Sequence, residues 1–168
     1  TSGRLTARPW AAKPTPGLED VAPRFPPQIR RALLSGALDV PKWQEDAYGA
    51  AFPSMLKLLK ALHDAGVVMI PGTDGLSGYM LHHELELYAR AGIAPAEVLR
   101  SATWASAQVM GVEANRGAVA AGKYADMILI DGDPTRDIVD IEKIDTVIKG
   151  GKVYDPAKIE AALGILPR

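Results

Sequence analysis

The clearest hydrophobic pattern in the chain lies in residues 54–65, where leucines and a methionine recur three or four positions apart. Lys57 and Asp64 are among the polar residues between them, and Gly66 follows where a left-handed C-cap is expected. This spacing predicts an amphipathic helix. Residues 67–70 read Val-Val-Met-Ile without polar alternation, which is typical of a strand covered on both faces. A helix, a glycine and a buried strand together indicate an α/β unit.

Further helices and then a β-rich segment are predicted after this unit. Helices are predicted over residues 79–91 and 95–110, and each is followed by a glycine. Beyond Gly111 the apolar pieces become short and are separated by Gly, Asp and Pro, which favours strands. The pair Gly150-Gly151 is typical of a two-residue hairpin turn. The strand-like pieces are residues 117–119, 125–130, 146–149 and 152–154, and residues 156–163 predict a final helix.

Prolines dominate the first part of the chain. Eight of the thirteen prolines lie in residues 1–53. Because proline fixes φ and removes a hydrogen-bond donor, residues 1–27 are interpreted as a loop. Residues 28–38 fit a short helix.

Composition narrows the class of protein. A length of 168 residues suits one domain, and the absence of cysteine excludes disulfides, thiol nucleophiles and cysteine metal sites. A net charge of −1 gives no sign of a nucleic-acid surface. No apolar run is long enough to span a membrane or to form a signal peptide, so we expect a soluble, cytoplasmic protein that binds neither nucleic acid nor membrane. The chain begins with Thr1 rather than Met, which suggests a piece of a longer protein.

Asp74 is the strongest candidate for chemistry. It follows the predicted strand at residues 67–70, and ligands of α/β sheets bind beyond the carboxyl ends of strands. A carboxylate there can ligate a divalent metal and take the proton of an attacking water. The alternative is a turn residue, because Gly-Thr-Asp-Gly also suits a turn or a helix cap. Gly75-Leu76-Ser77-Gly78 is interpreted as a loop over the site.

The three histidines favour structural roles. His82 and His83 are adjacent on a predicted helix, so their side chains point about 100° apart and cannot form a helical metal pair. At most one of them can reach a cavity. His63 lies near a helix C-terminus, where the helix dipole favours it. A Gly-x-Ser-x-Gly nucleophile elbow and a glycine-rich phosphate loop are both absent from the sequence.

Four stretches of the sequence carry a resemblance to a known family. Residues 65–74 (AGVVMIPGTD) and 85–103 (LELYARAGIAPAEVLRSAT) resemble the end of the amidohydrolase superfamily barrel. Residues 117–131 (GAVAAGKYADMILID) and 147–154 (VIKGGKVY) are similar to its closing β-sandwich segment. The subgroup that the chain resembles most is that of imidazolonepropionase-like enzymes and metal-dependent Xaa-Pro dipeptidases. The resemblance covers about residues 54–155.

The resemblance implies an α/β fold that is the C-terminal part of a (β/α)8 barrel plus part of a flanking β-sandwich. Residues 1–53 would be a proline-rich extended loop, residues 54–111 the last βα portion of the barrel, and residues 112–168 the sandwich segment. Asp74 would contact the metal and shuttle a proton to the leaving nitrogen, while Gly75 and Ser77 would contact substrate. In the complete protein the metal would be divalent, with zinc the first choice.

The chain departs from the family in its metal ligands. The family's His-x-His pair and its further histidines have no counterpart here. We therefore expect the C-terminal part of a hydrolase that cleaves a carbon–nitrogen bond, not a C–C bond or an ester, in a dipeptide or cyclic amide. This chain alone would bind no metal and be inactive, its N-terminal half being missing. The alternative is a non-catalytic binding or assembly module, covered by a partner or by a second copy in a homo-oligomer.

Overall fold

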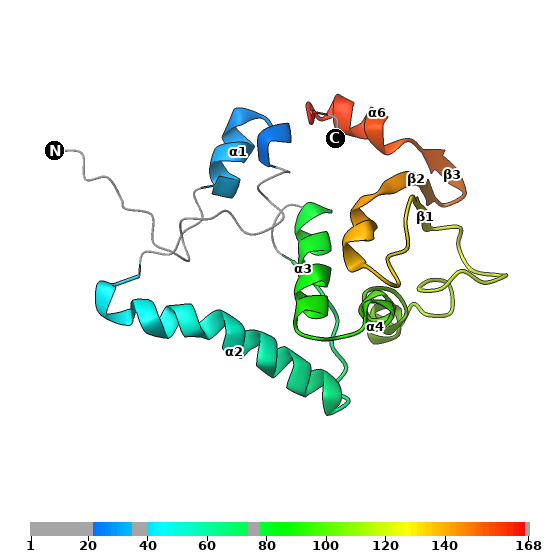
Figure 1. The fold of residues 1–168 in the computed structure, drawn as a ribbon. Coiled ribbons are helices and arrows are strands. Elements are labelled where there is room, and N and C mark those ends of the chain that lie inside the picture. The colour runs from blue at the N-terminus through cyan, green and yellow to red at the C-terminus, as the bar shows by residue number, and fades with distance from the viewer. Residues whose placement is uncertain (1–21, 35–39, 74–77, 167–168) are drawn as a thin grey trace. The chain divides into compact units, whose positions relative to one another are not determined.

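The structure is a computed structural model that describes residues 22–34, 40–73 and 78–166. Helices and strands are mixed along the chain, so the fold combines α and β elements as expected (Figure 1). The chain divides into two compact units. One contains residues 1–52 and 157–168, and the other contains residues 53–156. Within the described residues, no helix combines the length and the apolar character needed to cross a lipid bilayer.

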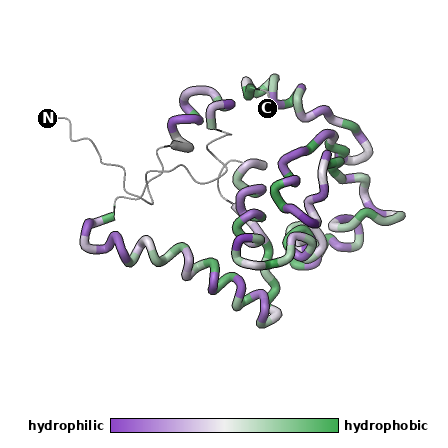
Figure 2. The backbone as a smooth tube through the Cα atoms, viewed as in Figure 1, coloured by the Kyte–Doolittle hydropathy of each residue, from purple (hydrophilic) through white to green (hydrophobic). Residues whose placement is uncertain are grey.

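The longest helix, α2, runs from Glu45 to Asp64 and follows the short 3-10 helix Lys42–Gln44. It confirms the predicted helix over residues 54–65 but begins nine residues earlier, because Pro53 lies inside it rather than before it. A proline removes one backbone donor, a loss that the flanking helix-forming alanines and leucines offset. Hydrophobic and hydrophilic stretches alternate along α2 (Figure 2). None of its residues is buried.

Two helical segments follow in the second unit. Helix α3 spans Tyr79–Arg90, close to the predicted residues 79–91. The predicted helix over residues 95–110 is present but changes its winding twice. It consists of α4 (Pro95–Arg100), a π-helical turn (Ser101–Ala105) and α5 (Ser106–Val109). Pro95 occupies the first turn of α4, where its missing donor costs nothing.

Three antiparallel strands form the sheet, in the order β1-β2-β3. Strand β1 spans Met127–Ile130, β2 spans Ile144–Lys149 and β3 spans Lys152–Tyr154. A bulge interrupts the β1–β2 register between Leu129 and Ile130. The predicted hairpin turn at Gly150-Gly151 is confirmed, since these residues have φ values of 57° and 77°, which favour glycine.

The core of the second unit lies between α3, α4 and the 3-10 helix Ile138–Glu142. Partly buried side chains from α2, β1 and the segment before α3 pack against it. Its buried members are Leu85, Tyr88, Ile93, Val98, Ile138 and Ile141. This cluster therefore connects the helical part of the unit to the sheet.

The first unit joins the two ends of the chain. It contains a 3-10 helix (Ala22–Arg24), α1 (Pro27–Leu34) and most of α6 (Pro156–Ala162). The buried Arg24 donates to Glu160 Oε2 at 2.6 Å and to the carbonyl of Leu166 at 2.7 Å. These contacts stabilise the unit because a buried guanidinium needs its donors satisfied. The loop expected over residues 1–27 is thus interrupted at residues 22–24.

The expectation of a buried strand at residues 67–70 is wrong for this structure. The segment belongs to none of the strands, and Val67, Val68 and Ile70 are 48%, 69% and 40% exposed. Only Met69 packs against the core. The prediction failed because a strand covered on both faces needs neighbours on both sides, and the described residues provide no pairing partner here.

The strand predicted at residues 117–119 is also wrong. Gly117 has a φ of 84° and lies so close to α5 that a Cβ built on it would be 2.6 Å from Ala107 Cβ. The chain bends at Gly117 where it meets the helix, so residues 117–119 do not form a strand. Glycine is required at Gly117 because any side chain would collide with the helix.

Candidate functional site

The predicted site residues Asp74, Gly75 and Ser77 lie outside the described residues. The described chain stops at Thr73 and resumes at Gly78, which has a φ of 86° and precedes α3. The structure therefore describes the chain on both sides of the candidate site.

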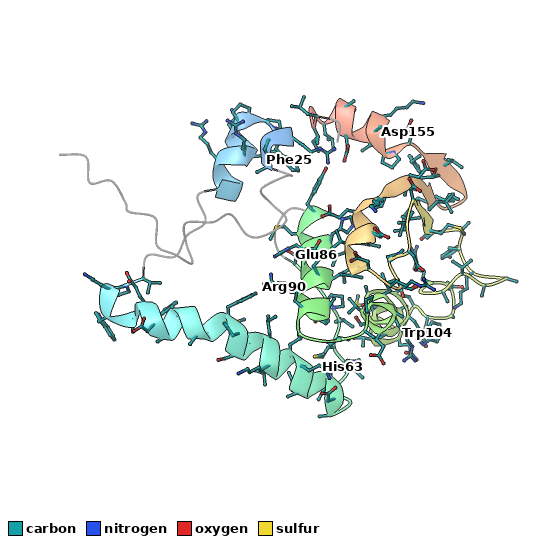
Figure 3. The ribbon with its side chains drawn as sticks, in the orientation of Figure 1. Phe25, His63, Glu86, Arg90, Trp104 and Asp155 are labelled. Atoms are coloured by element: carbon teal, nitrogen blue, oxygen red, sulfur yellow. The ribbon has the colours of Figure 1, made fainter. Side chains whose placement is uncertain are left out.

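Helix α3, which begins at Tyr79, carries a buried histidine close to a carboxylate. His83 Nδ1 lies 3.5 Å from Glu86 Oε2, one helical turn away. Figure 3 shows Glu86 and Arg90 on α3. His83 Nδ1 has no hydrogen bond in the described part of the chain. His82 is only partly buried, so the two neighbouring histidines occupy different surroundings, as their helical spacing predicted.

Burial perturbs two further groups on α3. It raises the pKa of the Glu84 carboxyl above its ordinary value, which the charge of His83 partly opposes. Burial also raises the pKa of Tyr88, and the negative charge of Glu84 adds to this shift. Both changes favour the neutral forms. Glu84 and Glu86 do not form a paired-carboxylate site, because they lie about 200° apart around the helix.

His63, at the end of α2, lies between two carboxylates. Figure 3 shows His63 at this end of the helix. Its Nδ1 is 3.4 Å from Asp64 Oδ1, and its Nε2 is 3.5 Å from Glu97 Oε2 on α4. Lys60 bonds the same Asp64, and these two neighbours, Lys60 first, hold the pKa of Asp64 below its ordinary value. The helix-dipole prediction for His63 did not include Glu97, because that residue is distant in sequence.

A cavity of about 530 Å³ borders this histidine. We call it the 67–69 groove, since Val67, Val68 and Met69 line it opposite the α4–α5 helix. Arg100 and Gln108 supply polar groups from that helix. The mixture of apolar lining and few polar groups is typical of a binding surface.

A second cavity, of about 720 Å³, lies between the same helix and the sheet. Its lining is mainly apolar and includes Met110, Val119, Met127 and Val147. Arg116, Asp126 and Lys149 also line it and are joined by ion pairs, at 2.5 Å for Arg116–Asp126 and 3.1 Å for Lys149–Asp126. Neither His82 nor His83 lines either cavity.

No group of three or more His, Asp or Glu side chains among the described residues could hold a metal ion. A stable divalent site needs three or four protein ligands. The donor set therefore does not suffice for the metal that the resemblance implies.

Sequence reasoning missed the 67–69 groove and the contact between His63 and Glu97. The groove exists because residues 67–70 are uncovered, the opposite of what their apolar run predicts. The contact between His83 and Glu86 could have been predicted from the sequence, because residues three apart on a helix are neighbours.

Comparisons with known proteins place these observations in a family. The family model described as the amidohydrolase family matches residues 52–154. One similar solved structure, an amidohydrolase, is 32% identical, aligns 60% of this chain with 25% of its own, and has a TM-score of 0.54. A structure from Bifidobacterium longum, described as that of a prolidase, is 30% identical over 68% of this chain and 30% of its own, with a TM-score of 0.60.

A Xaa-Pro dipeptidase with methionine bound in its active site is 26% identical, with a TM-score of 0.57. Here 82% of this chain aligns with 32% of that one. The chain thus spans about a quarter to a third of the length of these structures. A search of the curated proteins finds no significant match. Because the family model covers more than half of its residues, the chain belongs to the amidohydrolase family.

Proposed function

We propose that the chain is the C-terminal part of a metal-dependent hydrolase that cleaves a carbon–nitrogen bond. The substrate class is a dipeptide, Xaa-Pro first, or a cyclic amide. The family match over residues 52–154 carries this proposal, and the similarity to a prolidase and to a Xaa-Pro dipeptidase supports the dipeptide. The chain alone is inactive under this proposal.

Asp74 is the residue of this chain to which we assign chemistry. Its carboxylate takes a proton from the hydrolytic water and passes it to the leaving nitrogen, a role that suits a carboxylate beyond the end of a strand. Gly75 and Ser77 contact the substrate from the same loop.

The complete protein binds a divalent metal, with zinc the first choice. Since the described residues contain no metal-binding group, Asp74 must be joined by ligands from outside them. The metal would supply Lewis-acid activation of water.

The proposed architecture assigns three parts to the chain. Residues 1–53 form an extended loop segment, residues 54–111 the last βα portion of a (β/α)8 barrel, and residues 112–168 part of a flanking β-sandwich. Residues 67–70, which form no strand in this structure, are the eighth barrel strand of the complete protein in this assignment. The helix α2 before them and the apolar run itself support it.

The test uses the full-length protein and Asp74→Asn. Hydrolysis of an Xaa-Pro dipeptide and of a cyclic amide is measured together with bound metal by elemental analysis. Asp74→Asn is expected to lower kcat by about 10²–10⁴-fold, because a positioned proton-transfer group contributes that much. Asp145→Asn, an exposed substitution on β2, is the matched control and should leave turnover unchanged. A metal-free protein in which Asp74→Asn retains full turnover would overturn the proposal.

The exposed face of residues 67–70 favours a second candidate, a non-catalytic module that a partner or a second copy covers. Size-exclusion chromatography with light scattering examines it cheaply. A compact, metal-free monomer of this chain would contradict both a required partner and a missing half.

A further inference from the structure

The two ends of the described chain are tied together at Arg24. Its carbonyl accepts a hydrogen bond from Leu166 N at 2.9 Å, and its Nε donates to the Leu166 carbonyl at 2.7 Å. Its Nη2 forms an ion pair with Glu160 Oε2 at 2.6 Å, and only 9% of the Arg24 side chain is exposed. Hydrogen bonds from a charged donor are stronger than those between neutral groups. One buried residue near the start of the described chain therefore holds both α6 and the residues after it.

The end of α6 is shaped for this contact. The amides of Gly164 and Ile165 donate to carbonyls of the last helical turn, at 3.1 and 2.9 Å, in the pattern of a Schellman motif. Gly164 has a φ of 71°, a left-handed value that favours glycine. A Cβ built on it would be 3.9 Å from Pro26 Cγ, so the turn itself lies against the N-terminal segment. This turn directs Leu166 back to Arg24.

Both halves of the contact lie outside the part of the chain that the family model matches. The match covers residues 52–154, whereas the contact joins residues 22–26 to residues 160–166. Ala22 and Phe25 are 0% and 7% exposed, so the N-terminal half of the contact is packed as well as hydrogen-bonded. The contact therefore belongs to a packed segment to which the family match assigns no role.

The proposed function implies where residues 22–34 belong in the complete protein. Helix α2 comes directly before residues 67–70, which the proposed architecture makes a strand of the complete barrel. In a (β/α)8 barrel the chain enters each helix from a loop that follows the preceding strand, and these loops form the active-site face. The residues before α2 then belong to such a loop, and Asp74 follows the next strand at the same face.

We propose that residues 156–166 are a strap that fixes residues 22–26, and that this strap positions the active-site loop before α2 for substrate binding. The inference rests on the proposed function, which makes the segment before α2 part of the barrel. A loop that is held before the substrate arrives need not be ordered during binding, so the strap improves substrate affinity. Since the strap does not touch the reacting atoms, its loss should raise KM and leave kcat unchanged. Arg24 is accordingly a positioning residue.

The test uses the full-length protein and Arg24→Ala. Amide hydrogen exchange, followed by mass spectrometry, should become at least about tenfold faster in peptides covering residues 22–34 and 160–166. With the substrate that the protein hydrolyses, KM should rise about threefold to tenfold, while kcat stays within about twofold of the wild-type value. Arg136→Ala removes an arginine whose side chain is 87% exposed, and as the matched control it should change neither measurement.

A second variant, Gly164→Ala, keeps the Arg24 and Glu160 side chains and disturbs only the turn. It should change both measurements in the same direction and by less. Asp74→Asn should lower turnover without changing exchange in residues 22–34, so a failure of the hydrolase assignment and a failure of the strap are separable. Unchanged exchange in Arg24→Ala would show that there is no strap. Faster exchange with an unchanged KM, or with a fall in kcat alone, would show that the strap does not position the loop.

Discussion

Two apolar segments of similar composition differ in whether they pair into a sheet. Strand β1 reads Met-Ile-Leu-Ile and lies in a ladder with β2, whereas residues 67–70 read Val-Val-Met-Ile and pair with nothing in the described chain. The difference lies in where the partners are. The partner of β1 is β2, which follows it after residues 131–143, whereas the described residues offer residues 67–70 no partner. Apolar composition alone therefore does not make a strand.

The largest expected difference between the two regions is in the cost of removing an isoleucine. Ile141→Ala, 6% exposed in the core beside the sheet, should lower the free energy of unfolding by about 2–5 kcal/mol, because it leaves a cavity. Ile70→Ala, 40% exposed, is the matched control and should cost less than about 1 kcal/mol. Urea unfolding followed by circular dichroism measures both. Equal costs would show that residues 67–70 are buried after all.

Alanine substitutions of one glycine in each region should change the stability of the chain by smaller amounts. Gly151→Ala should destabilise the chain by about 1–2 kcal/mol, because its φ of 77° is left-handed and unfavourable for a side chain. Gly72→Ala, just after residues 67–70, has neither a positive φ nor an atom within 4 Å of the added Cβ. It should be neutral or stabilise by up to about 1 kcal/mol. The melting temperatures of the two variants, measured by thermal unfolding, test this difference. A lower melting temperature for Gly72→Ala would contradict the free space that the structure shows around Gly72.

The smallest effect concerns the acid sensitivity of the hairpin. Asp126 accepts from Gly150 N at 2.7 Å and from Lys149 Nζ at 3.1 Å. These bonds, that of Gly150 first, hold the pKa of Asp126 below its ordinary value of 3.8. A carboxyl whose pKa is lowered by folding stabilises the protein above the unfolded value, and the stabilisation is lost as pH falls through the folded value.

Asp126→Asn should therefore be less stable than the wild type near neutral pH, and the gap should close as pH falls below about 3.8. Melting temperatures measured between pH 7 and pH 2 check this. Asp145→Asn on the same sheet is the control. If the difference in melting temperature between the wild type and Asp126→Asn did not change with pH, the charge of the Asp126 carboxylate would not stabilise the hairpin.

Local signals explain what could be predicted from the sequence. The boundaries of α3 and the hairpin turn follow from periodicity and from paired glycines, which act over a few residues. The start of α2 is not predicted, because residues 1–53 are interpreted as a proline-rich extended loop, whereas Pro53 lies inside the helix.

Contacts distant in sequence explain what could not be predicted. Glu97 on α4 lies 3.5 Å from His63 at the end of α2, and no spacing in the sequence predicts this contact. The candidate site is similar in kind. Asp74 is predicted to follow a strand, but residues 67–70 form none in this structure, and Asp74 itself lies outside the described residues.

The π-helical turn at Ser101–Ala105 has a consequence for how the family sequence can vary in length. A π turn holds one residue more than an α turn, so it shifts the angular phase of everything after it by about 100°. Ala107, which meets Gly117, lies just beyond that turn. Deleting one residue between 101 and 105 would restore regular α winding and leave Ala107 facing the glycine, because the π turn is what accommodates the extra residue. The segment can therefore lose one residue without a change in the packing of Ala107 against Gly117, whereas the loss of two residues would rotate Ala107 by about 100° and break that contact.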